Sequence, residues 1–264
     1  LLVVCDFGLH TVSIVDLKTA ALRASVPAGR YPHCVAITPD ERTAVIANLL
    51  PSGSAAEHAS TSLVSLIDLD GGTKIADVPL PDNSANVRQV RISPDGRWAY
   101  LVHTRGRTML PTTQLDRGWV NTNALSIIDL NDAGGSQTRP YATVLLDTVT
   151  EGAADPWGIA LSPDGKTAWI SIAGAHQIAR IDLGRLHKLI AGKSGDPAPT
   201  QANDAAAIWQ QIQQDPTKRE ELSYHLSALY AADLMARVPI AAKGPRAIAL
   251  SPDGRQLMVA SHYS

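Results

Sequence analysis

The chain has 264 residues, of which 45% are hydrophobic and 18% are charged, and its formal net charge is -2 at pH 7. This balance offers no basic surface for nucleic acid or for an anionic membrane, so we expect neither as a partner. No apolar run approaches the roughly 20 residues that span a bilayer, and the length allows one large domain or two ordinary ones.

The recurring feature of the sequence is a turn of the type Ser-Pro-Asp-Gly that follows a short apolar strand. It occurs at residues 38–41, 93–96, 162–165 and 251–254, and it alternates with strand ends of the type Ile-Asp-Leu at residues 15–17, 67–69, 128–130 and 181–183. Proline presets φ of the second turn residue, and glycine accepts the positive φ that closes the hairpin. Glu41 stands where the other turns have glycine, so this turn must be strained or change type. A repeated β-meander predicts an all-β propeller of four-stranded antiparallel blades, built as one continuous array.

The first three units follow one another from the N-terminus. The first has expected strands at residues 2–4, 11–15 and 23–26, and the second at residues 34–38, 43–48, 63–69 and 74–80. The polar segment 51–62 is expected to be an exposed hairpin loop. The third unit has strands at residues 87–93, 98–103 and 124–130, and a long hairpin loop over residues 104–123 joins the last two.

The fourth unit, residues 155–183, is followed by a helical insertion over residues 184–235. Apolar residues recur at helical spacing at Ala205, Ile208, Trp209 and Ile212, with Asn203 as the expected cap. The sequence 217–220 is typical of a capping box, which predicts a second helix carrying Leu222, Leu226, Leu229 and Leu234. We expect this helical hairpin to be a docking element or a simple cover. The strand pattern resumes at residues 236–240 and 247–250, which gives about four blades in all.

The two ends of the sequence fall inside the repeat. Residues 1–17 align without gaps with residues 167–183, and the last residues align with the middle of a hairpin. We therefore expect residues 1–264 to be a partial β-propeller, taken from a larger ring of roughly seven blades.

Candidate metal ligands and catalytic groups do not form a recognisable pattern. The eight histidines include no His-x-His pair, and the two that align, His10 and His176, fall in a hairpin loop where a polar residue is expected anyway. The repeated aspartates are expected to accept hydrogen bonds from the backbone at turns and strand ends; they are Asp16, Asp68, Asp129 and Asp182, together with Asp40, Asp95, Asp164 and Asp253. We expect no metal site and no catalytic residue in this piece. Cys5 and Cys34 are either two thiols or one disulfide, which leaves the redox compartment open.

One stretch of the sequence has the composition of a binding surface. Loops on a rigid scaffold often carry binding residues, and the long loop of the third unit concentrates donors, a carboxylate and an aromatic ring. The candidate binding residues are His103, Arg105, Arg107, Asp116, Arg117, Trp119, Asn121 and Asn123. The alternative is a packed loop whose arginines pair with Asp116 and with backbone carbonyls.

The repeats resemble a known family. Units with an apolar strand, a Ser-Pro-Asp-Gly turn and an Ile-Asp-Leu strand look like the YVTN-type β-propeller repeats of bacterial surface and periplasmic proteins. Residues 110–119 (LPTTQLDRGW), 121–129 (NTNALSIID) and 243–247 (KGPRA) are similar to a subgroup in which the propeller is often joined to a di-haem domain like cytochrome c peroxidase. The resemblance implies an exported, redox-associated protein, with haem in a domain outside these residues and no cofactor within them.

The sequence favours a non-catalytic role over an enzyme. We expect a scaffold or docking module that contacts a protein partner or an adjacent redox domain through the loop around Trp119 and the helical hairpin. One alternative is a propeller enzyme such as a lactonase-like metal-dependent hydrolase. Another is a surface adhesion protein.

Overall fold

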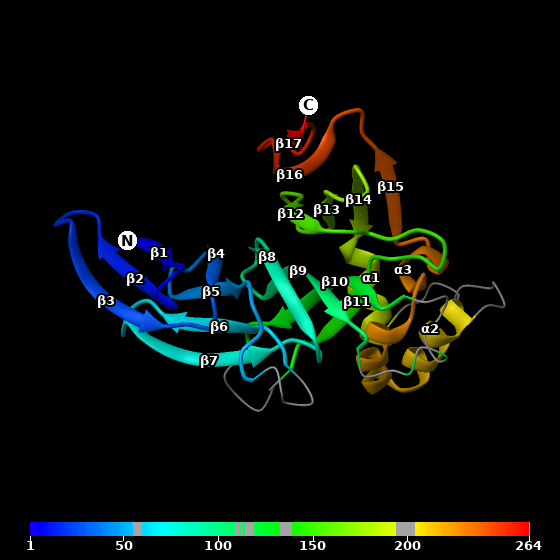
Figure 1. The fold of residues 1–264 in the computed structure, drawn as a ribbon, viewed down its shortest axis with the longest axis horizontal. Helices are drawn as coiled ribbons and strands as arrows, with labels where there is room; N and C mark the ends of the chain where they lie inside the picture. The colour runs from blue at the N-terminus through cyan, green and yellow to red at the C-terminus, as the bar shows by residue number, and fades with distance from the viewer. Residues whose placement is uncertain are drawn as a thin grey trace.

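Consecutive strands form antiparallel sheets that stand side by side along the chain (Figure 1). The computed structural model describes residues 1–54, 60–108, 111, 113, 119–132, 139–193 and 204–263. The first sheet contains β1 (Leu2–Asp6), β2 (Thr11–Asp16) and β3 (Ala21–Pro27), and the second contains β4 (Pro32–Ile37), β5 (Thr43–Asn48), β6 (Leu63–Asp68) and β7 (Thr73–Pro79).

The later sheets repeat this order. The third contains β8 (Ser84–Ile92), β9 (Trp98–Gly106), β10 (Asn121–Asp129) and β11 (Ala142–Leu145), and the fourth contains β12 (Pro156–Leu161), β13 (Thr167–Ile172), β14 (Gln177–Asp182) and β15 (Met235–Pro239). The fifth has β16 (Lys243–Leu250) and β17 (Leu257–Tyr263). Within each sheet neighbours in sequence are neighbours in space, so the predicted all-β fold of four-stranded propeller blades is confirmed.

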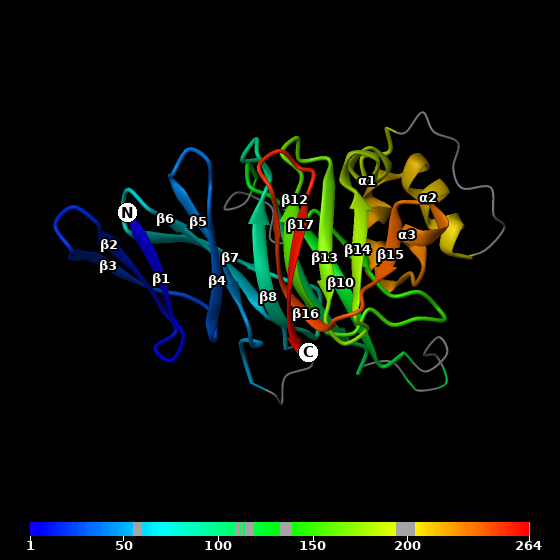
Figure 2. The same ribbon diagram turned by 90° about the horizontal axis from the view of Figure 1, so that it is seen from above.

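Hydrophobic cores lie between successive sheets. Val12 and Ile14 of the first sheet pack with Ala44 and Ile46 of the second, and further cores join the second sheet to the third and the third to the fourth. The first strands of neighbouring sheets, β4, β8, β12 and β16, lie next to one another, and Figure 2 shows them running side by side. This radial stacking lets each sheet bury both faces, which a single meander cannot do.

The repeated aspartates act on the backbone, as the sequence predicts. In the third sheet Asp95 accepts hydrogen bonds from Ser93 Oγ (2.5 Å) and from the Arg97 N–H (3.1 Å), and these bonds lower the pKa of its carboxyl. Asp16, at the end of β2, accepts from the N–H groups of Lys18 (2.8 Å) and Thr19 (3.1 Å). These carboxylates are therefore parts of turns, which is the structural role expected for them.

The turn at residues 38–41 has the same backbone conformation as the other three turns, and its last residue is strained as a result. Glu41 has φ 60°, while Gly96, Gly165 and Gly254 have φ of 75°, 69° and 70°. The turn type is therefore unchanged, and Glu41 adopts a left-handed conformation that side chains disfavour.

The insertion differs in detail from the prediction. Its helices are α1 (Leu183–Ile190), α2 (Asp204–Gln214), the 3-10 helix η3 (Pro216–Tyr224) and α3 (Ala228–Ala231). The predicted capping box is wrong: Asp215 caps η3 by accepting the Thr217 N–H (3.0 Å), and no single helix carries the four leucines. Helix α1 was not predicted, and it begins directly after β14 because Asp182 accepts the Arg185 N–H (2.9 Å) as its cap. The expected cap Asn203 lies outside the described residues.

The long hairpin of the third sheet is shorter than predicted. Strands β9 and β10 pair as far as Gly106 and Asn121, so residues 104–106 and 121–123 are strand and not loop. Ladder hydrogen bonds thus extend into a segment whose polar composition suggested a loop.

Candidate functional site

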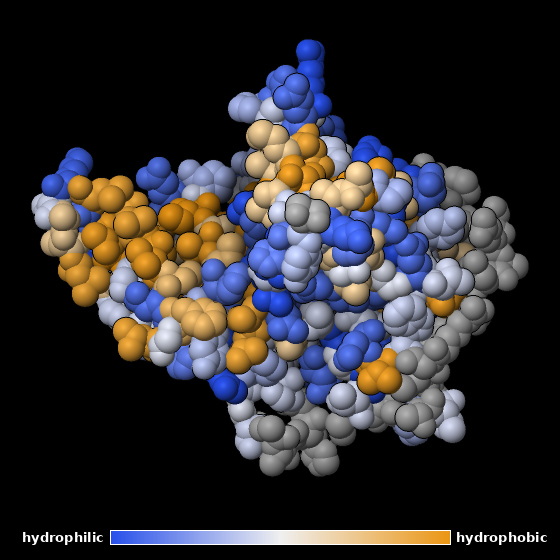
Figure 3. Space-filling view, turned by 45° about the horizontal axis from the view of Figure 1, so that its top comes forward, coloured by the Kyte–Doolittle hydropathy of each residue, from blue (hydrophilic) through white to orange (hydrophobic). Residues whose placement is uncertain are grey.

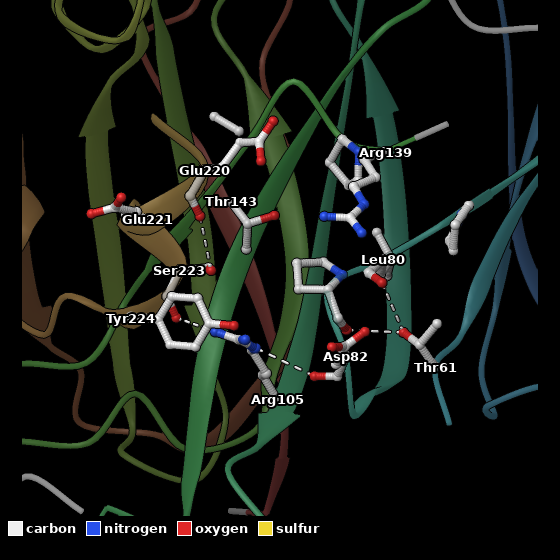
Figure 4. Close-up of a pocket in the computed structure, with 14 residues that line it drawn as sticks. Thr61, Leu80, Asp82, Arg105, Arg139, Thr143, Glu220, Glu221, Ser223 and Tyr224 are labelled. Atoms are coloured by element: carbon white, nitrogen blue, oxygen red, sulfur yellow. Dashed lines mark hydrogen bonds between the residues drawn. The ribbon is translucent and has the colours of Figure 1, made fainter. Parts of the chain in front are cut away.

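A cavity of about 340 Å³ lies between the sheets and the insertion. Its walls come from the end of β7 and the turn that follows it, from strands β9 and β11, and from η3. The lining residues include Thr61, Leu80, Asp82, Arg105, Arg139, Thr143, Glu220, Glu221, Ser223 and Tyr224. Figure 4 shows Arg105 against the ring of Tyr224 at one side and Arg139 beside Leu80 at the other.

Arg105 is the residue that joins the two parts of this cavity. Its side chain donates from Nη1 to the main-chain oxygen of Ser223 and from Nε to that of Asp82 (3.3 Å), and its guanidinium lies 4.2 Å from the centre of the Tyr224 ring. Only 4% of Arg105 is exposed. A buried guanidinium with carbonyl acceptors and an aromatic ring is held rigidly, so Arg105 fastens η3 to the third sheet.

The remaining lining suits polar binding better than catalysis. Arg139 brings a second guanidinium, and Asp82, Glu220 and Glu221 bring carboxylates. The Ser223 hydroxyl donates to the main-chain oxygen of Glu220 (3.2 Å) and so is not held by a base, as an activated nucleophile would be. The cavity can accept a polar group through charged hydrogen bonds.

His103, the first of the predicted binding residues, is enclosed by the third sheet. It is fully buried, with Nε2 2.8 Å from Ser126 Oγ and Nδ1 donating to the main-chain oxygen of Thr104 (3.1 Å). Burial lowers the pKa of His103 to about 4 because a charged imidazole has no water around it there. A neutral, enclosed histidine of this kind stabilises the sheet.

Asn123 and Arg107 also make internal contacts. Asn123 donates from Nδ2 to Oδ1 of the buried Asp147 (2.9 Å), which also accepts the N–H of Ala153 (2.7 Å). Burial raises the pKa of Asp147 despite these bonds. Arg107 donates from Nη2 to the main-chain oxygen of Tyr224 (3.0 Å), and it thus holds the end of η3 beside Arg105.

The other predicted residues are spread along the same hairpin. Trp119 is half-buried, and its Nε1 donates to the main-chain oxygen of Val149 (3.4 Å). Asn121 is exposed at the start of β10. Asp116 and Arg117 lie outside the described residues. Of the described candidates, only Arg105 lines the cavity, and its opposite wall comes from η3, more than a hundred residues later. No signal in the sequence connects the two, so Tyr224 and Glu220 were not predicted.

Among the described residues, no three histidine, cysteine, aspartate or glutamate side chains are grouped so that they could hold a metal ion. Cys5 and Cys34 are free thiols, both half-buried, and burial raises the pKa of Cys5 to about 12. Within the described part of the chain, no helix is long and apolar enough to cross a membrane.

These features define a β-propeller with a cavity at the edge of one blade, and the comparisons with known proteins agree with the fold. The chain is similar to the beta subunit of hydrazine synthase from Kuenenia stuttgartiensis, with 27% identity over 258 residues that cover 97% of this chain and 57% of that protein. No family model matches the chain.

Solved structures show the same architecture. Hydrazine synthase of Kuenenia stuttgartiensis matches with a TM-score of 0.60 at 22% identity, over 98% of this chain and 77% of that one. The Cps50 (Swd1) β-propeller domain of Myceliophteria thermophila matches with a TM-score of 0.53 at 12% identity, over 98% and 62%. The dihydro-heme d1 dehydrogenase NirN in complex with DHE matches with a TM-score of 0.54 at 17% identity, over 98% and 39%. At these identities the structural matches establish the propeller fold alone.

Proposed function

We propose that this chain is part of a non-catalytic β-propeller that binds a protein partner in an exported, haem-linked assembly. The observation that carries the proposal is the similarity to a named subunit of a larger enzyme over nearly the whole chain. The link to haem rests on the resemblance of residues 110–119, 121–129 and 243–247 to the subgroup joined to a di-haem domain. The YVTN type, a joined domain like cytochrome c peroxidase and a periplasmic location belong to the same proposal, and they rest on the repeat motifs.

The first sheet presents an apolar surface. Leu2 and Val4 of β1 and Leu22 of β3 are 46%, 37% and 61% exposed. Leu2 and Leu22 both lie directly opposite Val15 on the neighbouring strands, so their side chains project from the same face of the sheet. We call these three residues the open face. Figure 3 shows hydrophobic side chains gathered over this end of the molecule.

The repeat indicates what covers such a face. Leu2 and Val4 align with Ala168 and Ile170 of β13, which are fully buried in the core between the third and fourth sheets. The matching positions in the second sheet, Ala44 and Ile46, are also fully buried against the first sheet. The face that Leu2 and Val4 present is therefore the one that receives another propeller sheet elsewhere in the ring. We propose that a further sheet of the propeller, with an apolar face, packs on it in the full-length protein.

The first experiment is to purify the full-length protein from its native source and to measure its native mass and visible absorption. A mass above that of its own polypeptide, together with a haem Soret band, supports the proposal. A monomer without a chromophore contradicts it.

A variant of the open face tests the surface itself. We expect Val4→Asp to lower the free energy of unfolding of the full-length protein, measured in urea, because a carboxylate cannot be buried against an apolar sheet without a large free-energy cost. The matched control is Tyr230→Asp, since Tyr230 is a 67% exposed side chain on α3, at the other end of the molecule (Figure 1). Equal free energies of unfolding for the wild type and both variants would contradict the packing of a sheet on the open face.

A further inference from the structure

The first strands of the sheets carry a feature that neither the cavity nor the open face involves. The antiparallel pairing with the next strand is interrupted by a β-bulge near the same place in β4, β8, β12 and β16. The interrupted position lies six residues before the turn proline, and it is occupied by His33, Arg88, Trp157 and Arg246. A β-bulge re-aims the side chain of an unpaired residue, and bulges are frequent next to functional sites.

The backbone before each bulge has the same conformation in all four strands. The residues two positions earlier are Tyr31, Asn86, Asp155 and Gly244, with φ of 57°, 57°, 55° and 65°. Three of these are not glycine, and a left-handed conformation is unfavourable for a residue that carries a Cβ. The sheets thus repeat a strained backbone at one level, and strain of this kind is found at binding sites.

The four bulge side chains meet in space. The guanidinium of Arg88 lies 4.1 Å from the centre of the Trp157 ring, and that of Arg246 lies 4.3 Å from it. These arginines come from β8 and β16, the strands on either side of β12. The ring of His33 is 6.5 Å from that of Trp157, and His33 Nδ1 donates to the main-chain oxygen of Arg88 (3.0 Å). We call His33, Arg88, Trp157 and Arg246 the axial cluster.

The axial cluster has more positive charge than its surroundings neutralise. Arg88 forms one long ion pair with Asp155 (3.5 Å). Within the described part of the chain, Arg246 forms no ion pair and no side-chain hydrogen bond, and its Nε is buried without a partner. A half-buried guanidinium normally finds an acceptor, because burial without one costs free energy. Stacking on Trp157 holds Arg246 in place while leaving its hydrogen-bond donors unused.

We propose that the axial cluster binds a small planar carboxylate, which accepts hydrogen bonds from Arg246 and is attracted by Arg88. A guanidinium presents two parallel N–H donors that match the two oxygens of a carboxylate. The exposed ring of His33 provides a flat contact for a planar ligand.

The test is calorimetric titration of the full-length protein with sodium benzoate at constant ionic strength, with sodium phosphate as a second ligand. We expect saturable benzoate binding that weakens at least tenfold in Arg246→Gln and several-fold in Arg88→Gln. Arg246→Lys keeps the charge but lacks the paired donors, so its affinity should lie between those of the wild type and Arg246→Gln. The control is Arg180→Gln, which removes an exposed arginine from β14 and should bind as the wild type does.

Circular dichroism and thermal unfolding establish that each variant is folded. The absence of saturable binding to the wild type overturns the proposal. Equal weakening in Arg180→Gln and Arg246→Gln also overturns it, because the effect would then be one of net charge. Phosphate binding tighter than benzoate at Arg246 would overturn the assignment to a carboxylate. A quench of tryptophan fluorescence by benzoate that is lost in Trp157→Phe locates the ligand at the axial cluster.

Discussion

The turn at Glu41 offers a direct test of how the repeat stabilises the propeller. Glu41 is exposed and has φ 60°, in the place where three other turns have glycine. We expect Glu41→Gly to stabilise the protein, since glycine adopts positive φ without steric cost.

The magnitude follows from two opposing terms. A left-handed conformation costs about 1–2 kcal/mol for a residue with a Cβ, and the extra backbone entropy that glycine loses on folding offsets roughly 0.5–1 kcal/mol of the gain. The net stabilisation is about 0.5–1 kcal/mol. For a chain of this size that corresponds to a rise in Tm of roughly 1–4 °C.

The glycines of the other turns also leave room for a proline of the preceding sheet. Substitutions of these glycines therefore serve as matched controls. A Cβ at Gly165 would lie 2.9 Å from Pro94 Cδ, in the turn of the preceding sheet, and a Cβ at Gly96 would lie 3.2 Å from Pro39 Cδ. Gly165→Ala therefore combines positive φ with overpacking between sheets and should cost about 2–4 kcal/mol. Gly96→Ala should cost less, because its contact is longer.

Urea unfolding of the three variants and the wild type measures these differences. The expected order of stability is Glu41→Gly, wild type, Gly96→Ala, Gly165→Ala. A destabilised Glu41→Gly, or a Gly165→Ala variant as stable as the wild type, would refute the argument that φ and sheet packing determine the residue at this position.

Three further predictions concern the buried polar groups. Arg105→Met should cost roughly 2–4 kcal/mol in urea unfolding and raise proteolysis within the insertion, because it removes the hydrogen bonds that hold η3 to the third sheet. Asp147→Ala should cost a similar roughly 2–4 kcal/mol in the same assay, since it leaves the buried donors of Asn123 and Ala153 without an acceptor. The folded-state pKa of His103, about 4, is below the ordinary 6.5, so its contribution to stability is present above pH 6.5 and is lost as pH falls toward 4. His103→Gln should therefore lose less stability than the wild type, by on the order of 2–3 kcal/mol, between pH 7 and pH 4.5 in urea unfolding.

Much of the fold was predictable because the repeat signals are local. The turn at residues 162–165 and the strand end at 181–183 each depend on a few adjacent residues, and such signals determine strand order in a meander. The helical insertion was harder, because two neighbouring sequences can both resemble a cap. Thr217 and Glu220 match a capping box, yet Asp215 lies two residues earlier and its carboxylate takes the Thr217 N–H.

The candidate site was less predictable, for a physical reason. Polar residues near a long loop look alike in sequence whether they face solvent or a neighbouring element. Arg105 and Asn123 are polar because each has a buried partner, and those partners, the Ser223 carbonyl and Asp147, are fixed by tertiary structure. The axial cluster was not predicted because His33, Arg88, Trp157 and Arg246 share a position but not a chemical type.

Two hairpin histidines hold the backbone close to the position that the four cluster residues share. His10 Nδ1 accepts the N–H of Tyr31 (3.1 Å), and His176 Nδ1 accepts the N–H of Gly244 (3.1 Å). Both acceptors reach from one sheet to the positive-φ residue two positions before the bulge of the next. In two of the repeats, the histidine of the hairpin loop thus connects neighbouring sheets through a hydrogen bond. Because each histidine accepts its hydrogen bond from the residue two positions before the bulge, the side chain at the bulge itself is free to differ from sheet to sheet. A backbone that repeats and a side chain that varies allow one architecture to assemble a site from dissimilar residues, and the axial cluster has this property.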